Sequence, residues 1–407
     1  MLHRLEIENF YSIRDPQVID LRAAAHSDEA SDRLSPVWKG SGERAPKVVA
    51  LFGPNASGKS NVLKAVSFLS WFTVHSFGAA PDARLPYQRF MDEDARDQPT
   101  RLAVHFGGPG DLAHLPDADT DAPQCRYSYE VSFGGPRAES PRVLSESLKY
   151  WPPDAKRQVR LFERDEFHRV VAGKGFDLAG YGQALEKILR PNASVVSTLA
   201  QLGHPIAQVL VAAATSVTSN ILVEKYDLSR SVVDQHYAKN PALLEMLNKD
   251  LERLGLGVRA MRVEQGVNGP TAFFDHAGLA EPLDASSESH GTRLFISIFP
   301  YLVSALQTGG VALVDELDLA IHPLVLPEIL SWFYDPGRNP HDAQLWMTCQ
   351  NASLLDTLTK EEVLFCEKDG RGRTSVYGLR DVQSVRRGDN FYRKYLSGVY
   401  GAVPNVG

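Results

Sequence analysis

The segment 53–60 constrains this chain more than any other part of its sequence. Its residues, Gly-Pro-Asn-Ala-Ser-Gly-Lys-Ser, match the phosphate-binding loop pattern G-x-x-x-x-G-K-[ST] in full. The apolar, β-branched run 48–52 predicts a buried strand before the loop, and apolar residues at helical spacing in 60–72 predict a helix after it. Strand, glycine loop and helix in this order predict a nucleotide triphosphate site, with a chance glycine turn as the alternative.

The residue types in this loop suit phosphate binding. Glycines at 53 and 58 let the backbone wrap closely around phosphates, while the N–H groups of the loop and the helix start face the negative charge. Lysine is predicted to reach the β and γ phosphates and the following serine to ligate Mg²⁺. We therefore predict ATP and Mg²⁺ as cofactors, bound by the loop and its flank: Gly53, Asn55, Ala56, Ser57, Gly58, Lys59, Ser60 and Asn61.

Composition narrows the class of protein. With 407 residues, of which 43% are hydrophobic and 23% charged, the chain is long enough for a large core divided into two or three lobes. Its three cysteines lie far apart without a C-x-x-C pair, which favours a reducing cytoplasm. We expect no membrane segment, because no apolar run approaches the length of a span. The net charge of −7 leaves nucleic-acid binding possible but does not support it.

The order of expected elements suggests three parts. Residues 2–9 and 17–22 predict a hairpin, 24–46 a long loop, and four alternating segments between 101 and 163 an antiparallel β lobe. The pattern between 180 and 256 is helical. We expect a first half of a nucleotide-binding head with the phosphate loop and β lobe, an inserted helical arm, and a second half of the head: 1–179, 180–260 and 261–407.

A second nucleotide motif follows much later in the chain. The apolar strand expected at 311–314 ends in Asp315 and Glu316, which resembles a Walker B motif. In this reading Asp315 holds the hydration shell of Mg²⁺ and Glu316 polarises the attacking water. An ordinary strand that ends in an acidic turn is the alternative. Small GTPases and RecA-like cores do not need the long insertion between the two motifs, whereas heads of the ABC type do.

The run 286–293, Ser-Ser-Glu-Ser-His-Gly-Thr-Arg, leads into an apolar helix just before this strand, where an ABC-type signature belongs. Ser289 and Gly291 at a helix start would supply a hydroxyl, free N–H groups and a positive dipole end to a γ-phosphate from another subunit. The alternative is an ordinary helix N-cap by Ser287 or Ser289.

Two glutamines complete the expected site. Gln350 follows the strand expected at 344–348, where many ABC-type heads carry a histidine that contacts the γ-phosphate. A glutamine hydrogen-bonds a phosphate but has no titratable proton, so it is either a phosphate contact in a slow enzyme or a polar strand end. Gln88 is the candidate for the glutamine that links the Mg²⁺ site to the β lobe; Gln98 and a solvated loop residue are the alternatives.

Several segments together resemble the RloA/AbiL-like ATPases, which are ABC-type ATPases related to the OLD, RecF and SMC heads. They are the opening 7–13, the phosphate loop, the block SHGTRL, the run DELDLAIHPLVLPEIL and the ending 395–404. The resemblance covers nearly the whole chain. It implies an α/β fold, namely an ABC-type P-loop head with a mixed β-sheet, an adjoining antiparallel β lobe and an inserted short helical arm, in a homodimer or higher oligomer.

The resemblance also implies a biological role. In that family the ATPase is typically encoded in bacterial phage-defence or restriction-associated loci together with a separate effector protein, a nuclease being one candidate. The family commonly has T-[ST]-H-N where this chain has Thr348-Cys349-Gln350-Asn351, which bears on its turnover rate. Two other function classes stay open: a RecF-like DNA-repair clamp that is ATP-dependent, and a scaffold that binds nucleotide with little hydrolysis.

The segment 363–370 invites a further reading. An apolar strand that ends in Glu367 and is followed by glycine resembles the first carboxylate of a Toprim nuclease. The residues that follow contain no D-x-D on a second apolar strand to complete a two-metal site. We therefore expect an ATPase without intrinsic nuclease activity.

Overall fold

The computed structural model describes residues 1–23, 32–112, 123–135, 141–153, 157–226, 228–383, 385–386 and 388–404. Its centre is a six-stranded sheet in the order β11-β15-β16-β5-β17-β18, in which all strands are parallel except the edge strand β18. The strands are β11 (Val217–Ser219), β15 (Val311–Val314), β16 (Gln344–Thr348), β5 (Val48–Phe52), β17 (Val363–Lys368) and β18 (Thr374–Gly378).

Both faces of this sheet are covered, as its sequence requires. All five residues of β5 are at most 1% exposed, and successive residues point into two different core clusters. Val49 and Leu51 face one cluster, whereas Val48, Ala50 and Phe52 face the other. A parallel strand that is buried on both sides reads as a continuous apolar run, which is why 48–52 was recognisable.

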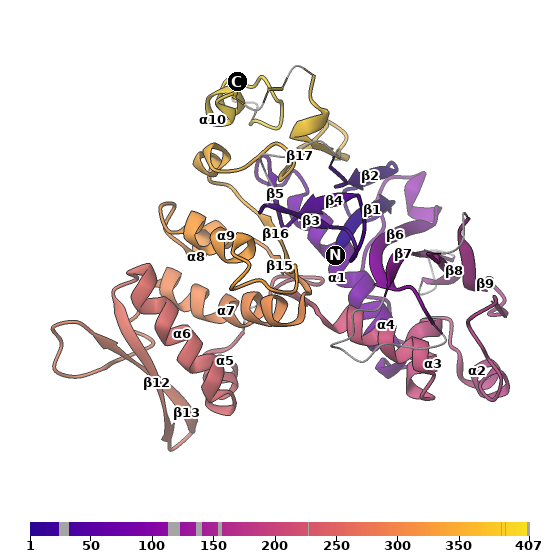
Figure 1. Ribbon diagram of the computed structural model, residues 1–407, viewed down its shortest axis with the longest axis horizontal. Coiled ribbons are helices and arrows are strands. Elements are labelled where there is room, and N and C mark those ends of the chain that lie inside the picture. Colours follow the sequence, from indigo (N-terminus) through magenta and orange to yellow (C-terminus); the bar gives the residue numbers. More distant parts are fainter. Residues whose placement is uncertain are drawn as a thin grey trace.

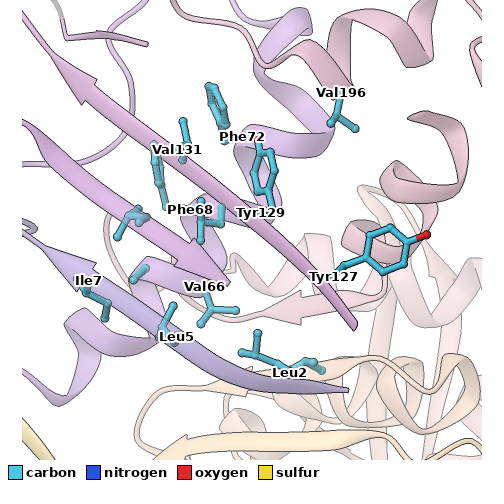
Figure 2. Close-up of a cluster of buried hydrophobic side chains, with 14 of the residues drawn as sticks. Leu2, Leu5, Ile7, Val66, Phe68, Phe72, Tyr127, Tyr129, Val131 and Val196 are labelled. Atoms are coloured by element: carbon cyan, nitrogen blue, oxygen red, sulfur yellow. The ribbon is translucent and has the colours of Figure 1, made fainter. Parts of the chain in front are cut away.

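The first cluster joins the parallel sheet to an antiparallel one in the order β10-β9-β8-β7-β6-β1-β2. Helix α1 (Lys59–His75) follows the phosphate loop and packs Phe68 and Phe72 against Phe133 of this second sheet. Figure 2 shows both phenylalanines beside Tyr129 and Val131 of the same sheet. The strands are β1 (Leu2–Glu8), β2 (Gln17–Asp20), β6 (Thr100–Pro109), β7 (Gln124–Gly134), β8 (Arg142–Trp151), β9 (Val159–Arg164) and β10 (Val170–Ala172).

The second cluster covers the opposite face with helices and a small antiparallel sheet. Figure 1 shows α5, α6, α7 and the β12–β13 hairpin on one side of the parallel sheet, and β6–β9 with α2–α4 on the other. This half contains α5 (Arg230–Lys239), α6 (Pro241–Leu254), α7 (His290–Thr308), α8 (Leu317–Ala320), α9 (Leu326–Tyr334), α10 (Phe391–Leu396), β12 (Val258–Gly266), β13 (Gly269–His276) and β14 (Leu283–Asp284).

Short elements connect these layers. Within the expected loop 24–46, residues 24–31 lie outside the described part of the chain, and the rest forms a small hairpin. The remaining elements are β3 (Leu34–Pro36), β4 (Arg44–Pro46), α2 (Gly182–Ile188), α3 (Val195–Gln201), α4 (Pro205–Thr215) and 3₁₀ turns at Ser76–Gly78, Ala95–Asp97, Ala352–Asp356 and Leu379–Asp381.

The expected α/β fold with a mixed sheet, a β lobe and inserted helices is confirmed. Within 180–260, α3 and α4 pack on α1, β11 joins the parallel sheet, and α5 and α6 pack on β13 and β12. The division at 180 and 260 stays a prediction. In the described part of the chain no single helix is long and apolar enough to cross a membrane; α3 and α4 pass that test only as a pair bent by 114°.

Candidate nucleotide site

The predicted nucleotide motifs meet at one edge of the parallel sheet. β5 ends at the phosphate loop, β15 ends at Asp315 and Glu316, and β16 lies between these two strands and ends at Thr348. Because parallel strands place their carboxyl ends on the same edge, residues far apart in sequence converge there. Asp315 is thereby brought within hydrogen-bond distance of Ser60.

The phosphate loop needs glycine at both of its glycine positions. Gly53 has φ 148° and Gly58 has φ 100°, values that L side chains rarely adopt. A Cβ atom on Gly53 would lie 2.2 Å from the carbonyl oxygen of Cys366, and one on Gly58 would lie 2.3 Å from Thr374 Oγ1. The loop is therefore packed closely against Cys366 of β17 and Thr374 of β18.

Two hydroxyl groups from distant segments support the loop. Thr374 Oγ1 donates to the Ser57 carbonyl oxygen over 2.8 Å and lies 2.7 Å from Ser12 Oγ. Asn61 Nδ2 donates to the same Ser12 oxygen over 2.7 Å. These contacts give Asn61 a structural role in the site. Ser12 and Thr374 were not predicted as site residues, because no sequence pattern links two positions so far apart.

Lys59 is folded over the loop. Its Nζ donates to the carbonyl oxygens of Gly53 (2.8 Å) and Pro54 (2.9 Å), and the residue is only 7% exposed. Burial lowers the pKa of Lys59, and Asp315 is among the groups that oppose this effect. Asn55 and Ala56 are exposed at the loop tip, while Ser57 is buried. The ammonium group therefore lies beside the concave backbone that would cradle phosphates.

A hydroxyl and a carboxylate suited to Mg²⁺ face each other beside the loop. Ser60 Oγ donates to Asp315 Oδ1 over 2.9 Å, and Thr348 Oγ1 donates to the same oxygen over 2.8 Å. Thr348 Oγ1 also accepts from the backbone N–H of Glu316 over 2.7 Å. Mg²⁺ prefers such hard oxygen donors and keeps several waters when the protein offers few. The donor set of Ser60 and Asp315 therefore fits the predicted ion.

Asn220 and Lys225 hold the second nucleotide motif, and the sequence alone predicted neither contact. Asn220, which follows β11, accepts from Asp315 N over 2.8 Å and donates to Asp315 O over 3.1 Å. Lys225 Nζ donates to Glu316 Oε2 over 2.9 Å. β11 has only three residues, too few to show a strand period, so nothing in the sequence placed Asn220 beside β15.

The structure places both predicted glutamines at the surface. Gln88 is exposed, and its carbonyl oxygen accepts from Tyr11 N over 2.8 Å. Gln350 is also exposed, and its backbone N–H donates to Asp318 Oδ2 over 2.8 Å. In the described part of the chain neither side chain donates to Ser60, Asp315 or Glu316. Their assignments to Mg²⁺ and to the γ-phosphate stay predictions.

Ser289 caps helix α7. Its Oγ accepts from Thr292 N over 3.0 Å, so the capping role that the sequence offered as an alternative is present. Gly291 lies in the first turn of the same helix. Across the described residues, no hydrogen bond or ion pair joins Ser289 or Gly291 to the phosphate loop of the same subunit. A contact with the nucleotide of a second subunit stays a prediction.

Glu367 has a structural partner at the chain's last described segment. The backbone N–H of Ala402 donates to Glu367 Oε1, and the carbonyl oxygen of Ala402 accepts from Tyr395 OH over 2.8 Å. Tyr377 OH donates to the Tyr400 carbonyl oxygen over 2.8 Å. The terminal block that contributes to the family resemblance therefore docks on β17 and β18.

We expect the three cysteine thiols to be unreactive in the folded protein. All are buried, and burial raises the pKa of Cys125 to about 11 and that of Cys366 to about 12. Burial also raises the pKa of Cys349. Because the thiolate is the reactive form, titration with a disulfide reagent at pH 8 should label none of them, and label all three after denaturation. Rapid labelling of one native thiol would contradict this expectation.

The fold and this site define a P-loop nucleotide-binding domain, with the two halves of its predicted nucleotide site contributed by distant parts of the chain. The chain belongs to the family described as "AAA domain, putative AbiEii toxin, Type IV TA system", whose model matches residues 48–356. None of the curated proteins compared with the chain matches its sequence.

Among solved structures, the chain is similar to heads of SMC proteins. A structure titled "SmcHead bound to the C-winged helix domain of ScpA" has 13% identity and a TM-score of 0.46, covering 93% of this chain and 97% of that chain. The SMC head domain from Thermotoga maritima has 12% identity and a TM-score of 0.42, covering 93% and 98%.

Proposed function

We propose that the protein is an ATP-binding and ATP-hydrolysing switch that works as a homodimer or higher oligomer. The observation that carries this proposal is the convergence of Lys59, Ser60, Asp315 and Glu316 at one sheet edge. Lys59 would bind the β and γ phosphates, and Ser60 and Asp315 would hold Mg²⁺, which neutralises charge as the phosphoryl group is transferred. Glu316 would orient the water.

A homodimer would supply the second set of contacts to the γ-phosphate. Ser289 caps a helix of 19 residues whose first N–H groups and positive dipole end suit an anion, and among the described residues it makes no hydrogen bond to its own phosphate loop. A second copy placed face to face would bring Ser289 to the nucleotide bound by the partner. ATP would then hold the two copies together, and hydrolysis would release them.

The switch would act in bacterial anti-phage defence by controlling a separate effector protein. Two features support this role: the resemblance to the RloA/AbiL-like ATPases, and a family description that names a toxin of a toxin–antitoxin system. Both point to systems of more than one protein. When a trigger of infection is detected, ATP-dependent dimerisation would change the surface that the effector recognises.

We expect steady ATP hydrolysis by the purified protein and its loss in Glu316→Gln. The amide keeps the size of the side chain but cannot accept a proton, so kcat should fall about 10²-fold or more, as for general-base residues. The variant should still bind ATP and should accumulate as a dimer. Hydrolysis assays, with mass determined by light scattering with and without Mg²⁺ and ATP, test both parts.

A matched control carries the same substitution elsewhere. Glu245 on α6 is exposed and, among the described residues, forms an ion pair with Lys249 alone, so Glu245→Gln should behave like the wild type. Absence of turnover in the wild type, with nucleotide still bound, would favour the scaffold. In that case Gln350→His is the first variant to make. ATP-dependent binding of duplex DNA would instead favour the RecF-like clamp.

A further inference from the structure

Glu316 is already engaged by a cation of its own subunit. Lys225 Nζ donates to Glu316 Oε2 over 2.9 Å, and among the described residues no other group donates to this carboxylate. A carboxylate that orients an attacking water accepts a hydrogen bond from that water. The ion pair with Lys225 occupies one of the two carboxylate oxygens of Glu316.

The turn that carries Lys225 is tied to the second nucleotide motif. Ile221 and Lys225 form an isolated antiparallel bridge, and Tyr226 N donates to the Asn220 carbonyl oxygen over 2.8 Å. The Asn220 side chain is in turn bonded to both backbone groups of Asp315. The backbone on either side of the ion pair is therefore fixed, and what is free to change is the pair of side chains.

The backbone of Glu316 is also specified closely. It adopts the left-handed conformation with φ 58° and ψ 49°, which is uncommon for a residue other than glycine. The hydrogen bond from Glu316 N to Thr348 Oγ1, 2.7 Å long, holds it there. Strained backbone of this kind occurs preferentially at functional sites, where surrounding contacts over-determine it. Rotation of the side chain therefore needs no change in the strand.

The ion pair is weak enough to exchange. The two side chains are 29% and 35% exposed, and pairs of this kind contribute little because water competes for both charges. A bound triphosphate would offer the ammonium group several negatively charged oxygens, and hydrogen bonds from an ammonium group to phosphate are charge-assisted. Lys59 is held similarly, on carbonyl oxygens of its own loop. Both lysines are therefore engaged by oxygen atoms of their own chain.

We propose that Lys225 is a positioning residue that restrains Glu316 in the nucleotide-free subunit and releases it when bound triphosphate draws the ammonium group away. This inference rests on the proposed ATPase function. The restraint keeps the hydrolytic carboxylate out of position until the site is filled, so Lys225 limits premature turnover.

A double-mutant cycle on stability tests the pair without measuring activity. The wild type, Lys225→Met, Glu316→Gln and the double variant are unfolded in urea, first without nucleotide. We expect the two substitutions to be coupled by a factor of about 2–5 in the unfolding equilibrium constant, the size of an exposed pair. With Mg²⁺ and a non-hydrolysable ATP analogue, the coupling should disappear. No coupling in the free protein, or equal coupling with the analogue, would overturn the inference.

Hydrolysis provides a second readout. Lys225→Met should raise kcat about 2–5-fold with little change in KM, because the same pair no longer has to be broken. Lys225→Arg keeps the charge and should retain the wild-type rate, and Lys225→Met should give no gain when Glu316→Gln is also present. Lys239→Met, at an exposed end of α5, is the matched control. A lower kcat in Lys225→Met would overturn the restraint and make Lys225 an aid to catalysis.

Failure of this inference and failure of the proposed function look different. If the ATP analogue stabilises all four proteins but the coupling is unchanged, the release of Glu316 is wrong and the nucleotide site stands. If the analogue stabilises none of them and none hydrolyses ATP, the proposed function falls, and the inference falls with it.

Discussion

The Lys59→Met protein is expected to fold normally but to bind Mg·ATP at least about 30-fold more weakly than the wild type. Truncating one partner of a desolvated charge pair typically costs about 2–5 kcal/mol, and each 1.4 kcal/mol is about tenfold in affinity. Hydrolysis should fall further, by about 10²–10³-fold, since the lysine also meets charge that develops on the phosphates. Isothermal titration calorimetry and a phosphate-release assay measure the two effects.

Folding of this variant should be preserved for a physical reason. Methionine keeps most of the apolar stem of Lys59, which is 7% exposed, and removes a charge whose desolvation opposes folding. Lys187 on α2 is exposed, so Lys187→Met is a control that should bind ATP like the wild type. Unchanged ATP affinity in the Lys59→Met protein would show that the predicted loop does not bind phosphates.

The largest loss of stability is expected for Glu146→Ala in the antiparallel sheet. Glu146 and Arg164 have fully buried side chains, with Arg164 Nη1 3.5 Å from Glu146 Oε2. Burial raises the pKa of Glu146 and lowers that of Arg164, while each charge favours the other. Glu146 also accepts from Tyr129 OH (2.9 Å) and from Val195 N (3.0 Å) at the start of α3. Removing it leaves a buried guanidinium and two unpaired donors.

We expect this substitution to lower the free energy of unfolding by about 3–5 kcal/mol, measured by urea denaturation. The exposed pair of Arg160 and Glu163 is the matched comparison, and Glu163→Ala should cost at most about 1 kcal/mol. A loss below about 1 kcal/mol for Glu146→Ala would mean that water or a rearranged partner compensates the buried arginine.

The motifs that sequence analysis located are those whose residues are contiguous or follow a simple period. The phosphate loop has its glycines, lysine and serine within eight positions, and β5, β15 and β16 are short apolar runs because they are buried. The β lobe was recognisable because its strands alternate. These features depend on interactions over a few residues, which the sequence displays directly.

The residues that hold the phosphate loop and Asp315 in place follow no such sequence pattern. Ser12 and Thr374 hold the loop from opposite ends of the chain, and Asn220 clasps Asp315 from a strand of three residues. Lys225, which contacts Glu316, lies in no sequence motif that would have pointed to it. Each of these contacts depends on sheet order, which is decided by the packing of the two core clusters.

The phosphate loop and the second motif predicted the chemistry from the sequence alone. A glycine loop that ends in lysine and serine, and an apolar strand that ends in two carboxylates, predict a Mg²⁺-dependent nucleotide site through local backbone and residue type. Sheet order in the folded chain places β16 between β5 and β15, brings Ser60 to Asp315 and sets Lys225 against Glu316. Sheet order depends on the burial of both sheet faces against helices from distant parts of the chain. The free energy of that burial is a sum over many side chains, so no short stretch of sequence reveals it.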